Sequence, residues 1–368
     1  MPANLLPRLF FIVCIIALSA TFSACNHSEP ISDNEAMSFA REMEKSIKQH
    51  NPAFINDAID KEELSDRISS KANIGLNFAM KRGIRDGIKN IHLGEQIANG
   101  ENTYELVKHY VKDGHRHLLF RLYGAQGLNY HDCELTKHKG KIRIADMYVY
   151  LVGQNLSEIM ARTINIYKEK NIDDATYTRG ANQIKEAQMY ANNGNYDAAA
   201  EAYRLIPQAF KGGKICRFLQ VEISLGQNDT AAYSRQVQAY VADFPGTPDI
   251  YLIQIGANFK LSNYHAALQA INDLDHFIDK DPFLDYYRGL AYKQMENRDS
   301  ATFCFKRLHA SRPQMQEALV ELIAGSLNMD KTAEASAYIA EYKKNKAYNQ
   351  DILHMLALSH PKYTAMFN

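Results

Sequence analysis

Gly194-Asn195-Tyr196-Asp197-Ala198-Ala199 is the stretch that decides the fold, because related phrases recur through the C-terminal half of the chain. Each phrase joins turn residues to alanines that follow within a few positions. Counted from Asn195, the recurrences come at steps of 33, 35, 35 and 33 residues. Self-similarity at a fixed period is typical of repeat architectures, in which stacked units bury a continuous core. The related phrases lie at 226–232, 262–267, 297–301 and 330–335.

The period and the internal pattern resemble the tetratricopeptide repeat, a helix–turn–helix unit of about 34 residues. In the first unit, small residues at Ala187 and Ala199 alternate with aromatic ones at Tyr190, Tyr196 and Tyr203. The fourth unit has the same arrangement, with Gly289, Tyr292, Ala301, Phe305 and Pro313. The resemblance implies about five helical hairpins over residues 176–347, followed by a capping helix and tail at 348–368. The alternative is a non-repeating helical bundle with accidental periodicity.

In this family the first helices of the hairpins line a concave groove that commonly binds a peptide or a partner protein. The resemblance therefore implies such a groove here. Its candidate contacts are the exposed positions expected on the first helices, namely Tyr251, Gln254, Tyr286, Arg288 and Lys293. The alternative is that the tyrosine rings pack between repeats. The repeats contain no Gly-rich phosphate loop and no G-x-S-x-G motif, so nothing in them predicts catalysis.

Residues 33–170 predict an α+β domain. Apolar residues at helical spacing follow a capping residue at Ser32 or Asp33, and two further helical segments are expected at roughly 53–68 and 73–92. The apolar period then changes to two, which predicts a four-stranded antiparallel meander. The expected strands cover 103–112, 116–124, 127–137 and 141–151. This order of elements resembles the nuclear-transport-factor-2-like (cystatin-like) folds, which host enzymes and binding modules alike.

Polar residues in this domain make an acid–base site an alternative function. Strict alternation on the fourth strand places Asp146 among apolar neighbours, which are Ile142, Ile144, Tyr148 and Tyr150. A buried Asp beside a His in a pocket can act as a general acid–base pair. Asp146 and His131 are therefore the candidate residues for small-ligand binding or for hydrolase or isomerase chemistry. The structural alternative is that Asp146 accepts hydrogen bonds from a helix or a tyrosine, while the histidines lie on the solvated face.

Other histidines and acids lie on the neighbouring strands, among them His109, His117 and Asp132. His115-x-His117 places two imidazoles on one strand face. Two ligands without a third in register do not make a zinc site, so no metal and no cofactor is predicted.

The leader, residues 1–25, has the layout of a secretory signal peptide: one positive charge at Arg8, an apolar run, then small residues. The apolar run is too short to predict a membrane-spanning helix. Its end, Phe22-Ser23-Ala24-Cys25, resembles the lipobox of bacterial lipoproteins, although Phe22 departs from the usual leucine. The resemblance implies cleavage before Cys25, diacylation of its thiol, and a polar tether over 26–32. The alternative is an ordinary signal peptide cleaved near Ala24.

Composition excludes some classes of partner. Lys and Arg together number 42, as do Asp and Glu, so no net field attracts nucleic acid. The three cysteines of the body are widely spaced, which favours buried thiols over a disulfide framework; one disulfide with one thiol left over is the alternative. They are Cys133, Cys216 and Cys304.

These patterns together predict a lipid-anchored protein of the cell envelope of a Gram-negative bacterium. Asn26 is not the Asp that retains enterobacterial lipoproteins at the inner membrane, which favours the outer membrane and leaves the face open. We expect a non-catalytic scaffold that binds a protein or peptide through its helical repeats. The alternatives are the ligand-binding or enzymatic pocket around Asp146, and a rigid spacer without a specific ligand.

Overall fold

The computed structural model describes residues 29–72, 78–89, 93–98, 102–124, 127–169, 172–344 and 348–367. The predicted signal peptide, Cys25 and the start of the tether lie outside these residues. Within the described part of the chain, no helix combines the length and the apolar character that crossing a membrane requires.

Short helices open the fold. The first, α1 (Asp33–Lys48), begins at the predicted cap: Ser32 and Glu35 form a reciprocal capping box, which satisfies two backbone N–H groups. The single segment expected over 53–68 is divided into α2 (Ala53–Ala58) and α3 (Lys61–Lys71). The chain is extended between them, where Ile59 forms a bridge with Ile144 and Asp60 caps α3. Next come α4 (Phe78–Lys89) and α5 (Leu93–Ile97).

The antiparallel meander is confirmed. Its strands are β1 (Thr103–Lys112), β2 (His115–Gly124), β3 (Gly127–His138) and β4 (Lys141–Val149), paired in chain order. A fifth strand, β5 (Gln154–Asn155), pairs with β4, so the expected four-stranded sheet has five strands. Two residues are too few to show alternation in the sequence. The following helix, α6 (Leu156–Glu169), packs against α3 and β4.

The two faces of β4 differ from the prediction because the β3–β4 register shifts. Glu134 lies opposite Asp146 while Leu135 lies opposite Ile144, which leaves Ala145 as an extra residue. Such a bulge moves the side chains beyond it to the other face. Ile142, Ile144, Met147 and Val149 therefore share one core, and Tyr148 and Tyr150 belong to another. Placing Ile142 and Ile144 on one face with the tyrosines was wrong.

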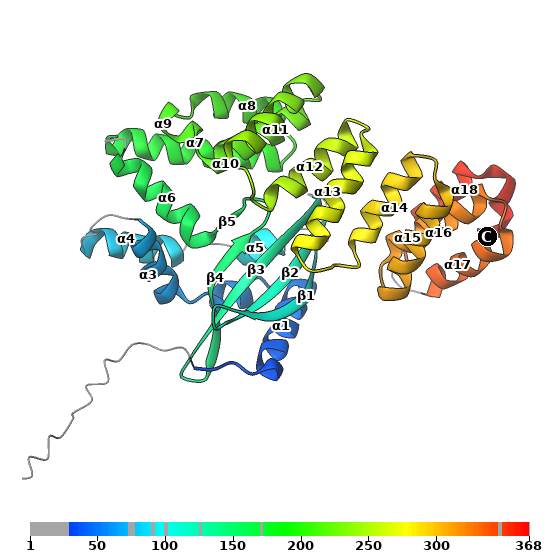
Figure 1. Cartoon of the computed structure of the whole chain (residues 1–368), viewed down its shortest axis with the longest axis horizontal. Helices are drawn as coiled ribbons and strands as arrows, with labels where there is room; N and C mark the ends of the chain where they lie inside the picture. The colour runs from blue at the N-terminus through cyan, green and yellow to red at the C-terminus, as the bar shows by residue number, and fades with distance from the viewer. Residues whose placement is uncertain are drawn as a thin grey trace, which may run out of the picture.

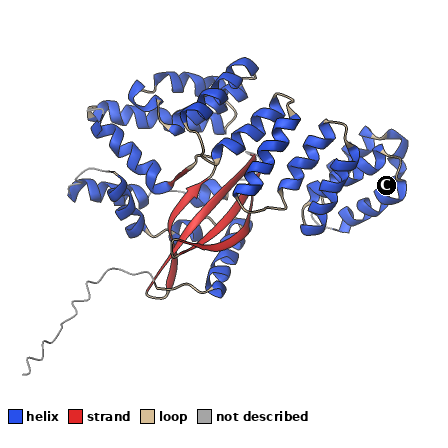
Figure 2. Ribbon diagram, viewed as in Figure 1, coloured by secondary structure: helices blue, strands red, loops and turns tan. Residues whose placement is uncertain are grey.

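Each face of the sheet carries its own core. One face packs on α1–α6 through Leu118, Phe120 and Met147. The other packs on the C-terminal helices through Leu119 and Tyr130, among others. Figure 2 shows the sheet in red at the centre, with helices on both sides. The architecture is thus an α+β part followed by an all-helical part (Figure 1).

The helical part consists of consecutive pairs in which each helix packs mainly on its chain neighbour. The pairs are α7 (Asp174–Asn192) with α8 (Tyr196–Leu205), α10 (Lys214–Gly226) with α11 (Thr230–Asp243), α12 (Asp249–Lys260) with α13 (Tyr264–Phe277), α14 (Leu284–Gln294) with α15 (Arg298–Ser311), and α16 (Gln316–Asn328) with α17 (Thr332–Lys344). A short helix, α9 (Gln208–Lys211), separates the first two pairs; α18 (Gln350–Ser359) and η1 (Pro361–Met366) close the chain.

The turns inside the pairs are periodic. One residue in each turn has a left-handed backbone, with φ between 56° and 73°, and each lies 34 residues after the one before. They are Gly194, Asn228, Ser262, Glu296 and Asp330. In the first four turns the next residue is the N-cap of the second helix. At Asn195, Asp229 and Asn297 the side chain of that residue accepts a hydrogen bond from the backbone N–H three residues on. The turns are therefore evenly spaced along the chain, although the steps counted from the sequence phrases are uneven.

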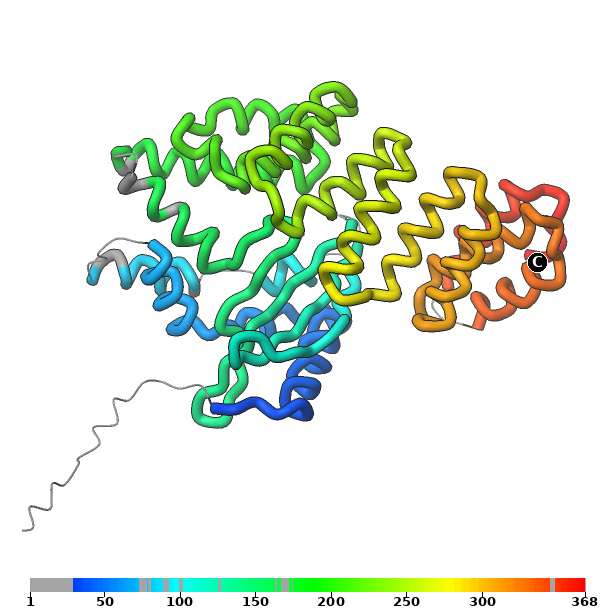
Figure 3. Tube along the Cα trace, in the orientation of Figure 1, coloured from blue at the N-terminus to red at the C-terminus, as the bar shows by residue number. Residues whose placement is uncertain are grey.

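The helical part arches over one end of the sheet, as the trace in Figure 3 shows, with α12 and α13 above the strands and the C-terminus beyond them. We call the side of α10, α12 and α14 that faces the sheet the inner face. An apolar pocket and a buried polar network lie on this face.

Candidate functional site

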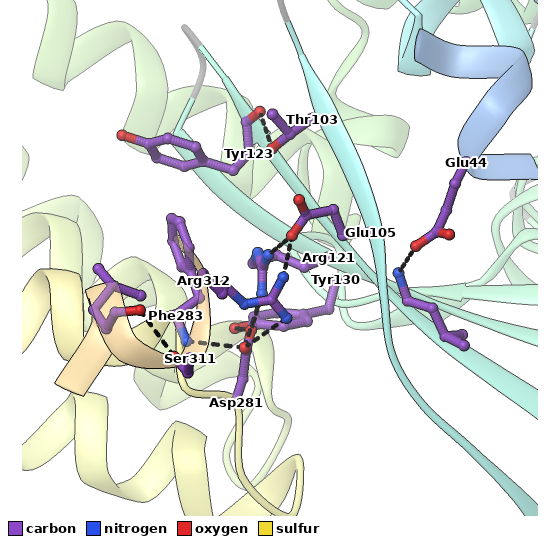
Figure 4. A network of polar contacts seen from close by, with 12 residues as sticks. Glu44, Thr103, Glu105, Arg121, Tyr123, Tyr130, Asp281, Phe283, Ser311 and Arg312 are labelled. Carbon is purple, nitrogen blue, oxygen red and sulfur yellow. Dashed lines mark hydrogen bonds and ion pairs between the residues drawn. The ribbon is translucent and has the colours of Figure 1, made fainter. Parts of the chain in front are cut away.

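The middle of the inner face is closed by the sheet through a buried polar network (Figure 4). Arg121 of β2 donates from Nη1 to both carboxylate oxygens of Asp281, which precedes α14, at 2.8 Å. The Tyr130 hydroxyl donates to the same carboxylate at 2.9 Å. The side chains of Arg121 and Asp281 are 1% and 0% exposed, and the guanidinium lies 4.3 Å from the centre of the Phe283 ring. Glu105 of β1 pairs with Arg121 and with Arg312, which follows α15.

A second buried pair joins the helices to the segment after β4. Lys214 at the start of α10 donates to Asp249 at 2.9 Å and to the carbonyl of Gly153 at 3.3 Å. Asp249 also accepts from the Tyr240 hydroxyl. Gly153 has a φ of +64°, and a Cβ there would lie 2.0 Å from the Asp249 carboxylate, so no larger residue fits. Buried charges that are paired and hydrogen-bonded in this way fix one arrangement of the two parts.

The two tyrosines predicted to line the groove lie in the apolar cluster between helices and sheet. The Tyr286 ring is 6.3 Å from that of Tyr123 on β2, and the Tyr251 ring is 6.3 Å from that of Phe277. Burial, with nearby Tyr123 as a further cause, raises the pKa of Tyr286 well above its ordinary range. Both rings thus have packing roles, the alternative left open by the sequence.

The three polar groove candidates lie elsewhere. Arg288 turns toward α13, where it donates to Asn272 at 3.0 Å and to Asp275 at 2.8 Å. Lys293 pairs with Glu321 of α16 at 2.7 Å. Gln254 is half-buried on α12. The two tyrosines therefore share one apolar cluster, whereas Arg288 and Lys293 pair with acidic residues of the helices. That the five candidates bind a partner stays a prediction.

An apolar pocket of about 300 Å³ lies on the inner face where α10, α12 and α14 meet the end of the sheet. Aromatic and aliphatic side chains line it, together with the backbone of Gly127 and the single charged residue Glu222. The lining residues are Gly127, Leu128, Leu151, Phe218, Val221, Glu222, Leu225, Tyr233, Leu252, Ile253, Ile255, Gly256, Phe259, Tyr287 and Leu290. Apolar walls with few polar groups are the usual character of small-molecule and side-chain sites.

Glu222 is unusual because its carboxylate has no hydrogen-bond or ion-pair partner among the residues that the structure describes. Burial in the apolar wall alone raises its pKa from 4.5 to about 7. Glu222 is half-buried, and an unpaired carboxylate that has lost part of its hydration costs stability. Perturbed carboxyl groups in pockets are candidates for functional groups.

Asp146 has a structural environment. It accepts hydrogen bonds from the backbone N–H of Ser157, at 3.2 Å, and from the Ser157 hydroxyl, at the beginning of α6. Burial raises its pKa, and these hydrogen bonds oppose the rise. A carboxylate at a helix N-terminus is favoured by the helix dipole. This is the helix-anchoring alternative foreseen from the sequence.

His131 lies apart from Asp146. It is opposite Val149 on β4, and its ring centre is 5.7 Å from that of Tyr104 in the core facing α1–α6. Burial lowers its pKa to about 4, so it is neutral at pH 7. No hydrogen bond joins Asp146 to His131 in the described part of the chain.

A different acid and histidine meet on the opposite face of the sheet. His117 Nδ1 lies 3.0 Å from Asp132 Oδ1, and the Tyr110 hydroxyl donates to the other Asp132 oxygen. Burial, followed by the Asp132 charge, raises the pKa of Tyr110. These residues line a polar cleft of about 520 Å³ that also includes His115 and Glu134. A carboxylate that holds one imidazole nitrogen leaves the other available for proton transfer.

No family model, curated protein or solved structure in the comparisons matches this chain. Within the ranges that the structure covers, no three His, Cys, Asp or Glu side chains are grouped to hold a metal ion. Cys133, Cys216 and Cys304 are free and buried, as expected, and burial is the main cause that raises their pKa values.

Glu222 was not predicted from the sequence as a site residue. Its only local signal is position: one acid in the run Phe218-Leu219-Gln220-Val221-Glu222-Ile223 of a largely apolar first helix. Asp132 and His117 were both expected on neighbouring strands. Only the register between β2 and β3 shows that their side chains are in contact.

Proposed function

We propose that this protein is a lipid-anchored envelope protein whose tetratricopeptide-like repeats bind a peptide segment of a partner protein. The observation that carries the proposal is the series of left-handed turn residues at a uniform 34-residue step, which matches the period of that repeat. Stacked hairpins of this kind form extended surfaces that bind partners. The pocket around Glu222 offers the partner a place on the inner face.

The sheet makes the proposal more specific. Because β2 and β3 cover the inner face near α13 and α14, a partner has access at the pocket beside α10 rather than along a continuous groove. The lipobox-like Cys25 would anchor the chain, with the α+β part between the anchor and the repeats. We retain the resemblance of that part to nuclear-transport-factor-2-like folds as a proposal based on its helices-then-meander order.

Site-specific photo-crosslinking in the intact envelope tests partner binding. A crosslinking residue at Leu225, which lines the pocket and is 37% exposed, should give a discrete adduct. The matched control is Gln238 on the exposed side of α11, which should give none. The same adducts from both positions, or none from Leu225, would contradict the proposal.

Fractionation tests the anchor separately. Cys25→Ser removes the thiol that carries the acyl chains, so the protein should leave the membrane fraction. Retention of the Cys25→Ser protein in that fraction would end the lipoprotein proposal without affecting the repeat.

A second candidate function, acid–base catalysis on a small ligand, is favoured by the His117–Asp132 contact in the polar cleft. It predicts that purified protein turns over a member of an ester and amide panel, and that His117→Gln lowers the rate at least tenfold. His138→Gln is the control, since His138 lies at the end of β3 and contacts Thr136. A rate unaffected by His117→Gln would remove this candidate.

A further inference from the structure

We propose that the inner-face pocket recognises an alkylammonium group, the lysine side chain of the partner peptide, through Glu222 and the aromatic rings around it. The inference rests on the proposed partner binding for the source of the amine. The recognition itself depends only on the pocket.

Aromatic rings make up much of the pocket lining. Phe218 of α10, Tyr233 of α11, Phe259 of α12 and Tyr287 of α14 contribute rings from four helices to one pocket. The Phe259 and Tyr287 ring centres are 6.3 Å apart, at an angle of 63°. Aromatic faces attract ammonium groups electrostatically, and several rings around one space form the cage that binds alkylated ammonium ions.

The pocket lining contains one carboxyl group and no basic side chain. Glu222 is the one lining residue with a carboxyl group, and no positive side chain pairs with it among the described residues. The two lining tyrosines stay neutral, since burial raises the pKa of Tyr233 to about 12 and that of Tyr287 further. A cation is therefore the complement that the pocket lacks.

The volume of the pocket limits what it can hold. At about 300 Å³ the pocket is at the lower limit for small-molecule sites, so it suits one long side chain better than a drug-sized ligand. Leu128, Leu252, Leu225 and Leu290 supply aliphatic wall for the methylene groups of such a chain. A lysine side chain has this character, with an apolar stem and a charged end.

The contrast with the paired carboxylates strengthens the assignment. Asp281 and Asp249 lie on the same inner face, and each has a basic partner within 2.9 Å. Glu222 lies eight residues after Lys214 on the same helix, yet that lysine is committed to Asp249 and to Gly153. The molecule thus satisfies its structural carboxylates internally and leaves one for an external cation.

Binding should be linked to a proton. The free pocket holds Glu222 with a pKa of about 7, and a bound cation would favour the ionised carboxylate. Tyr233 and Tyr287 are the other titratable groups facing the pocket, and neither ionises below pH 9. Amine affinity should therefore rise from pH 6 to pH 8, with release of a proton at the lower pH.

Calorimetric titration of the purified full chain tests the proposal with three probes of equal chain length: n-hexylamine, 1-hexanol and hexanoate. Hexylamine should bind at least tenfold more tightly than the other two. Glu222→Gln should remove that preference, whereas Glu201→Gln, which changes an exposed carboxylate on α8, should leave it intact. Equal binding of hexanol and hexylamine, unchanged binding by Glu222→Gln, or no binding of the amine would each overturn the proposal.

The lysine source is tested with N-acetyl-lysine amide against its Nε-acetyl form. The first should bind and the second should bind at least tenfold more weakly, because acetylation removes the charge. Equal affinity for both would contradict lysine recognition. A discrete Leu225 adduct in cells with no amine binding in solution would refute only the ammonium proposal, and amine binding without an adduct would refute only the protein partner.

Discussion

Two regions of the inner face, only a few helices apart, differ in how their carboxylates are paired: Asp281 is buried, whereas Glu222 is half-buried. Around Arg121 and Asp281, every carboxylate meets a guanidinium, and β2 and β3 seal the surface. Around Glu222 the wall is aromatic and aliphatic, and the carboxylate stands without a partner. The first region therefore stabilises the arrangement of helices and sheet, while the second retains an unpaired carboxylate that lowers stability when it is ionised.

Removing the guanidinium from the Arg121–Asp281 network should have the largest effect on stability. Arg121→Met leaves the Asp281 carboxylate, which is 0% exposed, without its guanidinium. We expect a loss of about 3 to 5 kcal/mol in the free energy of unfolding, measured by chemical denaturation. Arg204→Met is the control, since that arginine pairs with Glu201 on the surface and should cost at most about 0.5 kcal/mol. Similar losses for the two variants would contradict a structural role for the network.

The close packing between paired helices can be perturbed at Gly289 of α14. A Cβ there would lie 2.4 Å from the Phe305 ring of α15, so Gly289→Ala should destabilise the protein by about 2 kcal/mol through overpacking. Gly325→Ala in α16 is the control: its nearest neighbour would be Thr302 Oγ1 at 3.9 Å, and helix propensity should stabilise it by about 0.5 kcal/mol. A tolerated Gly289→Ala would count against close packing within the hairpin.

Removing the carboxylate of Glu222 should have the opposite effect and stabilise the protein. Because the pKa of Glu222 is raised from 4.5 to about 7, the folded protein binds this proton more tightly than the unfolded chain does. Its contribution to stability is thus fully present below pH 4.5 and is lost as the pH rises through 7. Glu222→Gln removes this loss and should stabilise the protein by about 2 kcal/mol at pH 8 and by almost nothing at pH 4. Destabilisation at pH 8 would mean that the carboxylate has a structural partner.

Local patterns were enough for most of the fold. The Ser32 cap, the strand periods and the turn phrases predicted α1, the meander and the helix pairs, because each depends on neighbours within a few residues. The bulge at Ala145 was not visible, since a one-residue shift leaves the apolar count of β4 unchanged. It reversed the face of the residues that had suggested a pocket.

Long-range pairing could not be predicted. Arg121 and Asp281 are 160 residues apart in the chain, and nothing near either residue signals the other. For the same reason the sequence placed Tyr251 and Tyr286 in an open groove, where they contact an apolar cluster shared with the sheet. Glu222 was missed because most of the side chains around it come from other elements, namely β3, α11, α12 and α14.

The central claim, that Glu222 is an unpaired carboxylate kept in an apolar pocket, is tested most directly by its own titration. Carbon-13 NMR of glutamate side-chain carboxyl groups in the full chain follows it, with Glu222→Gln assigning the signal. The account predicts a midpoint of about 7 in the free protein, and a lower one in the presence of hexylamine. A midpoint near 4.5 without ligand would show that the carboxylate is solvated or paired, and would contradict the account.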